Sequence, residues 1–371
     1  MKLAIVRQKY RSDGGAERFI SGALAGLAAT DLSTTIIARE WNDGGQHQVL
    51  ICNPPKGIGR VNRERNFSAA IQKLLSEHDF DLVQSHERVT GCSIYRAGDG
   101  VHAEWLTQRR RTLSPLKRLL QSISPYHRFV CENEREMFED SRLQSVICNS
   151  AMVRQEIAQR FDIDAKKLHL IYNGVDTDVF TPELRVLHRD KQRTALGICE
   201  QDTVAIYVGS GFERKGLKGA IYAIAKGSST ARLLVIGTDK KTKHYQRYAQ
   251  QLGVAERIHW LGVQQDVKPW YGAADLLLFP TLYDPFPNVV FEAMACGLAI
   301  VTSRKCGGAE LTDNNGIVCD ALDYDALAAA IGSLDDTEKC RQLGIASREK
   351  AETMKQQDMV KKLMNLYQQL I

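Results

Sequence analysis

The stretch LLLFPTLYDPFPNVVFEAMACGLAIVT, residues 276–302, contains a complete strand–loop–helix–strand pattern. Leu276–Phe279 and Ala299–Thr302 are short apolar runs of the kind that form strands buried on both faces of a parallel sheet. Val289–Cys296 has helical spacing, with Asn288 positioned to cap the helix and a glycine after it to end it. The stretch therefore predicts an α/β fold.

The same alternation extends in both directions along the chain. With 371 residues, the chain is longer than one hydrophobic core usually serves, so we expect two domains. The predicted strands are Leu3–Val6, Thr35–Ala38, Val49–Cys52, Asp81–Gln84, Val146–Asn149, Thr203–Val208, Arg232–Ile236, Ile258–Leu261, Leu276–Phe279 and Ala299–Thr302. The predicted helices are Ala16–Ala29, Met152–Arg160, Gly219–Lys226, Tyr245–Leu252, Pro269–Ala273, Val289–Cys296 and Tyr324–Gly332.

The domain boundary is placed near residue 175. Thr177–Arg193 is polar and predicts a connector, so residues 1–175 and 176–350 are expected to form one Rossmann-like domain each. Residues 351–371 continue a charged helical pattern and are expected to pack back on the first domain. Ligands of such sheets bind where parallel strands end, so the loops after strands are the places to look for a site.

Composition restricts the class of protein. Hydrophobic residues make up 44% and charged residues 25% of the chain, as in ordinary globular proteins. Nine scattered cysteines without a Cys-x-x-Cys pair favour reduced thiols over a disulfide framework or a structural zinc site. Met1–Arg7 predicts a first strand and not a signal peptide, and no segment approaches transmembrane length. We therefore expect a cytoplasmic protein without a bound metal.

A basic segment lies between Val101 and Val130. It contains one acid and six bases, interleaved with apolar residues that include Leu116, Leu119, Leu120 and Ile123. One interpretation is a surface for an anionic acceptor or an anionic membrane; the other is a solvated helix whose leucines face the core. No nucleic-acid recognition motif accompanies the segment. Its candidate surface residues are Arg109, Arg110, Arg111, Lys117 and Arg118.

Two carboxylates stand eight residues apart in the opening stretch. Asp284 belongs to a Pro-rich loop and Glu292 to the helix that follows. An ionised carboxylate accepts several hydrogen bonds, so the pair suits a ligand with many hydroxyl groups. A loop acid followed by a helix glutamate also occurs by chance in many α/β proteins, and both interpretations stay open.

Two glycine-rich loops follow predicted first strands. Gly14-Gly15 precedes a helix and either approaches an anion or simply makes a tight turn. In the second half, Gly209-Ser-Gly211 leads to Arg214-Lys215-Gly216 before a helix, which favours diphosphate binding over a basic loop tip. Because Arg214 stands where a nicotinamide fingerprint needs a third glycine, a dinucleotide site is disfavoured.

Asp99-Gly-Val-His102 carries an acid and an imidazole three positions apart. His102 could orient or deprotonate a hydroxyl group, and Asp99 could stabilise developing positive charge. An ordinary turn with a solvent-facing histidine explains the same residues.

Taken together, these motifs resemble the retaining GT-B glycosyltransferases of family four. Asp284-x7-Glu292 resembles the family's Glu-x7-Glu signature, Arg214-Lys215-Gly216 its donor-diphosphate clamp, and Gly14-Gly15 its N-terminal glycine loop. Within the family, the first strand and loop and Asp99-Gly-Val-His102 look most like lipopolysaccharide core glycosyltransferases. The resemblance spans the chain and implies two Rossmann-like domains whose parallel sheets face a central cleft.

The resemblance also implies roles for single residues. Asp284 would hold hydroxyls of the donor sugar, Glu292 would hold the ribose, and the backbone near Val263 would meet the base. Arg214 and Lys215 would neutralise the departing diphosphate in place of a divalent metal. The implied catalytic residues are Asp99, His102, Arg214, Lys215 and Asp284. The implied donor-binding residues are Gly14, Gly15, Gly209, Arg214, Lys215, Val263, Asp284, Phe286, Asn288, Val289 and Glu292.

The expected activity is metal-independent, retaining transfer of a hexose from a nucleoside-diphosphate sugar, with uridine favoured, to a glycan or glycolipid. The first domain would bind this acceptor and the second the donor, with no cofactor beyond the sugar nucleotide and no nucleic-acid partner. Lipopolysaccharide core assembly, with peripheral contact to the inner face of the cytoplasmic membrane, is the expected setting. Asp284 in place of the commoner Glu, and Pro287 in place of a frequent Gly, bear on which sugar is bound. The alternatives are a nucleotide-sugar epimerase of the same fold and a nicotinamide-dependent oxidoreductase.

Overall fold

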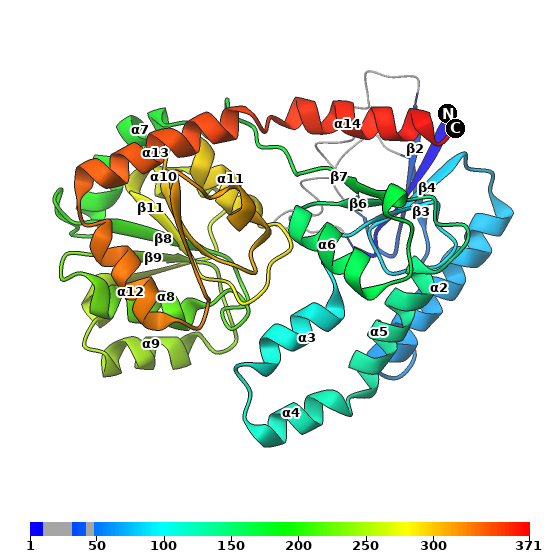
Figure 1. The fold of residues 1–371 in the computed structure, drawn as a ribbon, viewed down its shortest axis with the longest axis horizontal. Coiled ribbons are helices and arrows are strands. Elements are labelled where there is room, and N and C mark those ends of the chain that lie inside the picture. The colour runs from blue at the N-terminus through cyan, green and yellow to red at the C-terminus, as the bar shows by residue number, and fades with distance from the viewer. Residues whose placement is uncertain (10–31, 42–47) are drawn as a thin grey trace. The chain divides into compact units, whose positions relative to one another are not determined.

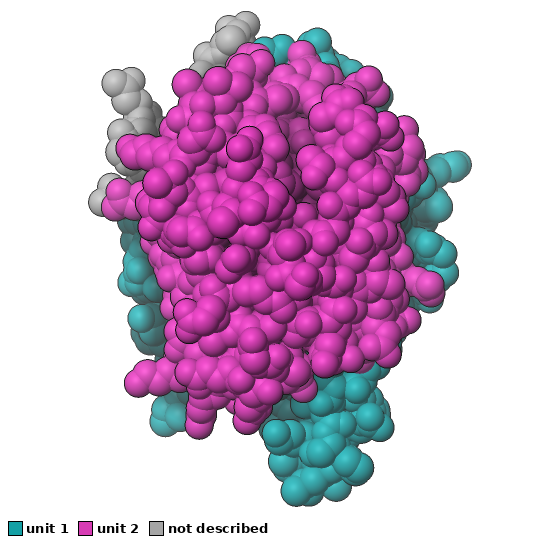
Figure 2. All heavy atoms as spheres, turned by 90° about the vertical axis from the view of Figure 1, so that its left-hand side faces the viewer, with its two compact units in different colours: residues 1–173, 356–371 teal, residues 174–355 magenta. Residues whose placement is uncertain are grey.

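The computed structural model describes residues 1–9, 32–41 and 48–371. The chain divides into two compact units, residues 1–173 with 356–371 (unit 1) and residues 174–355 (unit 2). Figure 1 labels the elements, and Figure 2 colours the atoms by unit. The predicted helix Ala16–Ala29 lies outside the described residues.

Unit 1 is built on a seven-stranded parallel sheet with the order β3-β2-β1-β4-β5-β6-β7. The strands are β1 Lys2–Val6, β2 Ser33–Ala38, β3 Gln48–Ile51, β4 Leu82–Ser85, β5 Ile94–Arg96, β6 Ser145–Cys148 and β7 Leu168–Leu170. The described helices are α2 Gly59–Glu77, α3 His102–Arg110, α4 Pro115–Ser122, α5 Pro125–Phe138, α6 Ala151–Arg160, η1 Ala165–Lys167 and α14 Gln356–Gln369.

Alternation along β1 decides which helix covers which face of this sheet. Leu3 and Ile5 point to the face where α14 packs, and Leu363 of α14 is fully buried there. Ala4 and Val6 point to the opposite face, against α2. The C-terminal helix α14 is therefore part of the core of unit 1.

Unit 2 contains a six-stranded parallel sheet with the order β10-β9-β8-β11-β12-β13. The strands are β8 Val204–Val208, β9 Arg232–Ile236, β10 Ile258–Gly262, β11 Leu276–Phe279, β12 Ala299–Ser303 and β13 Gly316–Cys319. The helices are α7 Glu183–Ala195, α8 Leu217–Gly227, α9 Thr242–Gln251, η2 Ala255–Arg257, α10 Lys268–Ala273, α11 Asn288–Ala295, η3 Gly307–Leu311, α12 Tyr324–Ser333 and α13 Thr337–Glu352.

The central strands of unit 2 are buried on both faces. In β11, Leu276 and Leu278 share one hydrophobic cluster with α8, α9 and α12, whereas α10, α11 and α13 pack against β8, β11 and β12. The register pairs Leu276 with Ala205 of β8 and with Ala299 of β12. Because all three strands are parallel, the loops that leave them start from the same edge of the sheet. The predicted two Rossmann-like domains with parallel sheets are confirmed.

Several predicted elements need correction. Thr177–Arg193 is not only a connector, because α7 begins at Glu183. The pattern misses three short strands, β5, β7 and β13. The C-terminal part of the chain forms two helices, α13 in unit 2 and α14 in unit 1, and α14 lies within the predicted segment 351–371. None of the described helices is both long and apolar enough to cross a membrane.

Candidate active site

The loop between β8 and α8 is shaped by glycines. Gly209, Gly211 and Gly216 all have positive φ, and Gly216 directly precedes the first residue of α8. A Cβ atom on Gly216 would lie 1.8 Å from the carbonyl oxygen of Pro280, so only glycine fits there. This close approach sets the loop of β8 directly against the loop that follows β11.

The two loops are also joined by hydrogen bonds. The carbonyl oxygen of Arg214 accepts the backbone N–H of Leu282 at 2.8 Å and the hydroxyl of Thr281 at 2.9 Å. The Arg214 guanidinium in turn donates to the carbonyl oxygen of Tyr283 at 3.2 Å. The predicted diphosphate clamp and the predicted sugar-binding loop are thus held together by direct contacts.

Two cations converge on the carboxylate of Asp284. Lys215 Nζ lies 2.7 Å from Asp284 Oδ2, and Arg214 Nη1 lies 3.5 Å from the same oxygen. The Asp284 side chain is only 8% exposed and that of Lys215 14%, whereas Arg214 is 40% exposed. Lys215 Nζ also lies over the ring of Phe279, 4.8 Å from its centroid.

The charge state of Asp284 follows from these contacts. Burial acts to raise the pKa of this carboxyl, but the nearby Lys215 and Arg214 outweigh it and hold the pKa below its ordinary value. The backbone of Asp284 is fixed as well, since its N–H donates to Lys305 and its carbonyl accepts from Gly307. Asp284 is therefore an ionised, rigidly held acceptor at neutral pH.

Glu292 lies in α11 and is 4% exposed. Its Oε2 accepts a hydrogen bond of 2.9 Å from the hydroxyl of Tyr271, which comes from α10. The predicted capping by Asn288 is wrong: Pro287 occupies the N-cap position, no side chain caps the helix, and Asn288 is its first helical residue. The glycine expected to end the helix, Gly297, has φ of 73° and does so.

The other predicted donor residues of unit 2 follow β8 and β10 or lie in and just before α11. Phe286 and Val289 are nearly buried, and the Phe286 ring packs 4.5 Å from that of Phe291, centroid to centroid. Gly209 is the first residue after β8. Val263 follows β10 and is 63% exposed. Gly14 and Gly15 lie outside the described residues.

Asp99 and His102 belong to unit 1, where Arg88 contacts Asp99 directly and reaches His102 through Glu134. The Arg88 Nε donates to Glu134 at 2.7 Å, and its Nη1 lies 3.7 Å from the exposed carboxylate of Asp99. Glu134 accepts the backbone N–H of His102 at 3.0 Å. The interpretation of a solvent-facing histidine is wrong, because His102 is half-buried at the start of α3 and its Nε2 lies 3.0 Å from Nδ1 of His127.

The environment keeps His102 uncharged. Burial, with additional repulsion from Arg88 and His127, lowers the pKa of His102 to about 3. Burial also raises the pKa of Glu134, although Arg88 opposes the shift. A neutral imidazole can accept or donate one hydrogen bond at a hydroxyl group, but it carries no charge of its own at neutral pH.

The basic segment forms α3, α4 and the start of α5, which extend as an arm from unit 1 (Figure 1). Along α4 and its C-cap residue, the four apolar side chains at i, i+3, i+4 and i+7 are 55–68% exposed: Leu116, Leu119, Leu120 and Ile123. The interpretation that these leucines face the core is therefore wrong. Of the predicted bases, Arg109 is half-buried, while the others are exposed: Arg110, Arg111, Lys117 and Arg118.

Four residues that contact the predicted site residues were not predicted from the sequence. Tyr271, Thr281, Arg88 and Glu134 act on the predicted residues through hydrogen bonds or ion pairs. Each is an ordinary side chain outside a recognisable motif, so only the fold reveals it. Among the residues that the structure describes, no group of three or more His, Cys, Asp or Glu side chains is arranged to hold a metal ion.

Two family models match consecutive parts of the chain. Residues 13–179 match "Glycosyltransferase Family 4", and residues 188–350 match "Glycosyl transferases group 1". The chain is a glycosyltransferase. This glycosyltransferase is 27% identical to the lipopolysaccharide glucosyltransferase WaaG of Escherichia coli (strain K12), over 83% of this chain and 81% of that protein. It is also 27% identical to a D-inositol 3-phosphate glycosyltransferase of Mycobacterium sp. (strain KMS), over 77% and 67% of the two chains.

Solved structures share the fold. The crystal structure of WaaG, described as involved in lipopolysaccharide biosynthesis, matches with a TM-score of 0.84 and 24% identity, covering 98% of this chain and 99% of that one. The Anabaena Alr3699/HepE structure in complex with UDP and glucose matches with a TM-score of 0.76 and 19% identity over the whole of both chains. The predicted GT-B architecture and the glycosyltransferase assignment are confirmed.

Proposed function

We propose that this glycosyltransferase moves a hexose from UDP-hexose to a glycan or glycolipid acceptor, with retention of the anomeric configuration and without a divalent metal. The observation that carries the proposal is the convergence of Lys215 and Arg214 on Asp284 at the carboxyl edge of the unit 2 sheet. Two cations at a helix N-terminus suit a diphosphate, and the adjacent carboxylate suits sugar hydroxyls. Uridine is favoured because a neighbour of the same fold binds UDP.

The contact between Lys215 and Asp284 suggests how the donor is received. The diphosphate competes with Asp284 for the ammonium group of Lys215, which releases lone pairs of Oδ2 for donor-sugar hydroxyls. Arg214, which is more exposed than Lys215, pairs with the negative charge that develops on the leaving phosphate. Glu292, oriented by Tyr271, accepts from the ribose hydroxyls. These cations act mainly in the transition state, where the leaving-group charge is largest.

Transfer then proceeds by displacement on one face of the sugar. The bond between the anomeric carbon and the diphosphate oxygen breaks, an oxocarbenium-like sugar forms, and an acceptor hydroxyl bonds to the same face. The hydroxyl proton passes to the departing phosphate oxygen. Asp99 stabilises developing positive charge, and neutral His102 orients a hydroxyl on the acceptor side.

The acceptor is proposed to be a lipopolysaccharide core glycan, because the similarity to WaaG extends over most of both chains. A cytoplasmic location, with peripheral contact to an anionic membrane, fits that setting. The contact surface is the exposed apolar stripe of α4 together with Lys117 and Arg118 on the same helix. A helix that combines an exposed apolar stripe with basic residues is suited to such a surface, although Arg118 Nε also donates to the carbonyl oxygens of Arg110 and Leu113.

Nucleotide binding tests the donor proposal. The melting temperature of the purified protein is measured with UDP, GDP, ADP, CMP and NADH, each with and without EDTA, since a ligand of the native state raises it. Selective stabilisation by UDP that resists EDTA is expected. Stabilisation by NADH alone would contradict the proposal. Product NMR with UDP-hexose and a core glycan then reports whether the anomeric configuration is retained.

Vesicle binding tests the membrane proposal separately. Sedimentation with vesicles containing anionic lipid should carry the protein down, and the Leu119→Asp, Leu120→Asp double variant should stay in solution. Val186→Asp, at an 87% exposed position of α7 in unit 2, is the matched control and should bind as the unmodified protein does. Equal binding by the α4 double variant would exclude the stripe as the contact surface.

A further inference from the structure

A cavity of about 420 Å³ lies in unit 2 at the opposite edge of the sheet from the candidate donor site. Its wall includes Thr203, Asp275 and Leu298, which directly precede β8, β11 and β12 at the amino ends of these strands. Lys215 and Asp284 instead lie in loops that leave the carboxyl ends of β8 and β11. Since strands rise about 3.3 Å per residue, strands of four or five residues separate the two places by more than 10 Å.

The cavity has the size and lining of a small-molecule site. Pockets for such ligands typically measure 300–1,000 Å³ and combine apolar walls with a few polar groups. Here the apolar wall includes Pro182, Tyr271, Leu298, Leu334 and Ile345. Arginines from α7 form another side of the cavity.

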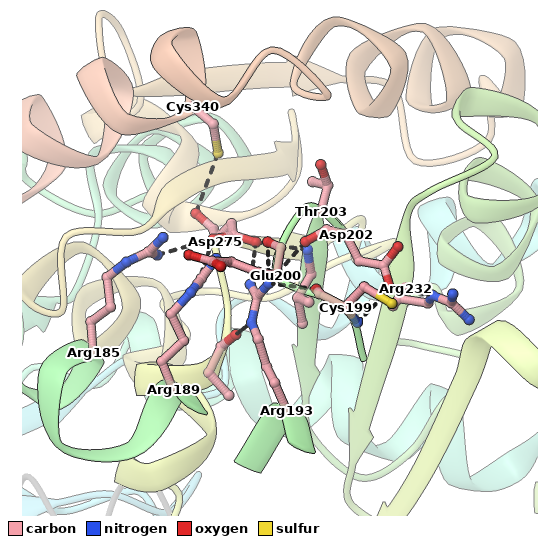
Figure 3. Close-up of polar contacts among 12 residues, drawn as sticks. Arg185, Arg189, Arg193, Cys199, Glu200, Asp202, Thr203, Arg232, Asp275 and Cys340 are labelled. Carbon is pink, nitrogen blue, oxygen red and sulfur yellow. Dashed lines mark hydrogen bonds and ion pairs between the residues drawn. The ribbon is translucent and has the colours of Figure 1, made fainter. Parts of the chain in front are cut away.

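The three arginines of α7 that face the carboxylate of Asp275 carry more positive charge than this one carboxylate neutralises. Arg185 and Arg189 both donate to Oδ1 of Asp275, at 3.0 and 2.8 Å, and Arg193 donates to Oδ2 at 2.6 Å. Figure 3 shows the three guanidinium groups converging on this one carboxylate. One negative charge therefore faces three positive charges.

Arg193 has a structural role, whereas the other two reach the cavity. Arg193 is buried and also donates to the carbonyl oxygens of Ala273 and Asp202, both at 2.9 Å. Arg185 and Arg189 line the cavity, and the Arg185 side chain is 47% exposed. Each guanidinium group has five N–H donors, of which the bond to Asp275 uses one.

The remaining charges of the wall are paired or solvated. Arg341 is paired with Glu338 at 2.8 Å, and Arg348 caps three backbone carbonyls and pairs with Glu352. Glu200 and Glu349 also line the cavity, but both are exposed and water screens their charge. Asp202, the other buried acid of the wall, pairs with Arg232 at 3.1 Å, so the positive excess lies at Arg185 and Arg189, which share Asp275.

We propose that this cavity binds an amphiphilic organic anion, whose single carboxylate or phosphate head pairs with Arg185 and Arg189 and whose short apolar chain fills the space toward Ile345. A planar guanidinium pair matches an oxyanion head by parallel hydrogen bonds. The apolar body supplies the favourable burial that an inorganic ion lacks. Arg214, Lys215 and Asp284 do not line this cavity, and the donor region reaches it only through Tyr271, whose hydroxyl orients Glu292.

Calorimetric titration of the purified protein with octanoate tests the proposal. One equivalent of octanoate should bind, and octyl phosphate distinguishes a phosphate head from a carboxylate head. Octan-1-ol should bind about tenfold more weakly, because it lacks the charged hydrogen bonds. Acetate should show no binding, since it lacks the chain. Saturating UDP should leave octanoate binding unchanged; displacement by UDP would assign octanoate to the donor site and overturn the proposal.

Variants locate the site within the protein. Arg185→Gln should weaken octanoate about tenfold and leave octan-1-ol unchanged. Ile345→Glu, at a 47% exposed position of the wall, should abolish octanoate binding, whereas Val186→Glu outside the cavity should not. Unchanged affinity in both Arg185→Gln and Ile345→Glu would overturn the proposal, and an unchanged far-UV circular dichroism spectrum would show that these variants remain folded.

Discussion

Replacing Lys215 by Met leaves Asp284 with one cation in place of two. Met keeps most of the apolar stem that packs over Phe279 but removes the ammonium group 2.7 Å from Asp284 Oδ2. Arg214 remains 3.5 Å from the same oxygen. The carboxylate stays buried, so its lost partner cannot be replaced fully by water.

The expected cost follows from these two distances. Attraction between charges varies inversely with distance, so 2.7 Å against 3.5 Å assigns about 56% of the attraction on Asp284 to Lys215. Since Arg214 is more exposed, water weakens its share further. Removing all partners of a buried charge costs about 3–5 kcal/mol, so Lys215→Met should lower the free energy of unfolding of unit 2 by about 2 kcal/mol.

Urea unfolding followed by tryptophan fluorescence measures this change. The chain has four tryptophans, and replacing Trp41 and Trp105 by Phe in every variant leaves Trp260 and Trp270 to report on unit 2. Lys240→Met, at an exposed position, is the matched control. If Lys215→Met and Lys240→Met unfold at the same urea concentration at pH 7, the argument from the buried carboxylate is refuted.

The pH dependence provides a second check. Because the folded pKa of Asp284 is lowered, its ionised form stabilises the protein above the ordinary carboxyl value, about 3.9, and this stabilisation is lost as the pH falls toward the folded value. The difference between the unmodified protein and Lys215→Met should therefore shrink below about pH 4. A difference that grows in acid would contradict the assignment.

Three further substitutions test separate parts of the structure. Gly211→Ala should cost about 1–2 kcal/mol for its positive φ, whereas Gly216→Ala should cost clearly more, because its Cβ would lie 1.8 Å from a backbone carbonyl oxygen; equal urea midpoints would contradict this. The lowered pKa of His102, about 3, means that acid destabilises the native state as the pH falls below about 6.5. His102→Gln should therefore lose less melting temperature between pH 7 and pH 5 than the unmodified protein, and an equal loss would speak against a neutral imidazole. Tyr271→Phe removes the hydroxyl that orients Glu292 and should weaken UDP binding about fivefold in a calorimetric titration, while unchanged affinity would separate Glu292 from the nucleotide.

Strong periodicity made most of the fold predictable. Arg232–Ile236 and Leu276–Phe279 were predicted with the bounds that the structure shows, because both are continuous apolar runs between clear breaks. Strands of three residues, such as β5 and β7, are too short to create a pattern. The sequence of α7 is too polar to show an apolar stripe. The helix packs on α10 through the buried Leu184, and its arginines pair with Asp275, which lies 82–90 residues away.

The candidate site was predictable as motifs but not as contacts. Asp284 and Lys215 were assigned to different parts of the donor, and nothing in their separation of 69 residues indicates that they form an ion pair. The exposure of Leu119 was equally hidden, because an amphipathic helix has the same spacing whether its apolar side meets a core or solvent. Tertiary packing decides both the ion pair of Asp284 and the exposure of Leu119.

The position of α14 affects the order in which the two units can be completed during synthesis. Leu363 and Tyr367 fill the core of unit 1, yet they are made after the whole of unit 2. A ribosome that adds about 5–20 residues per second needs roughly 10–40 s to travel from residue 174 to the end of α14. During that time the apolar face of the first sheet lacks its covering helix, so the unit that begins the chain is the last to be completed.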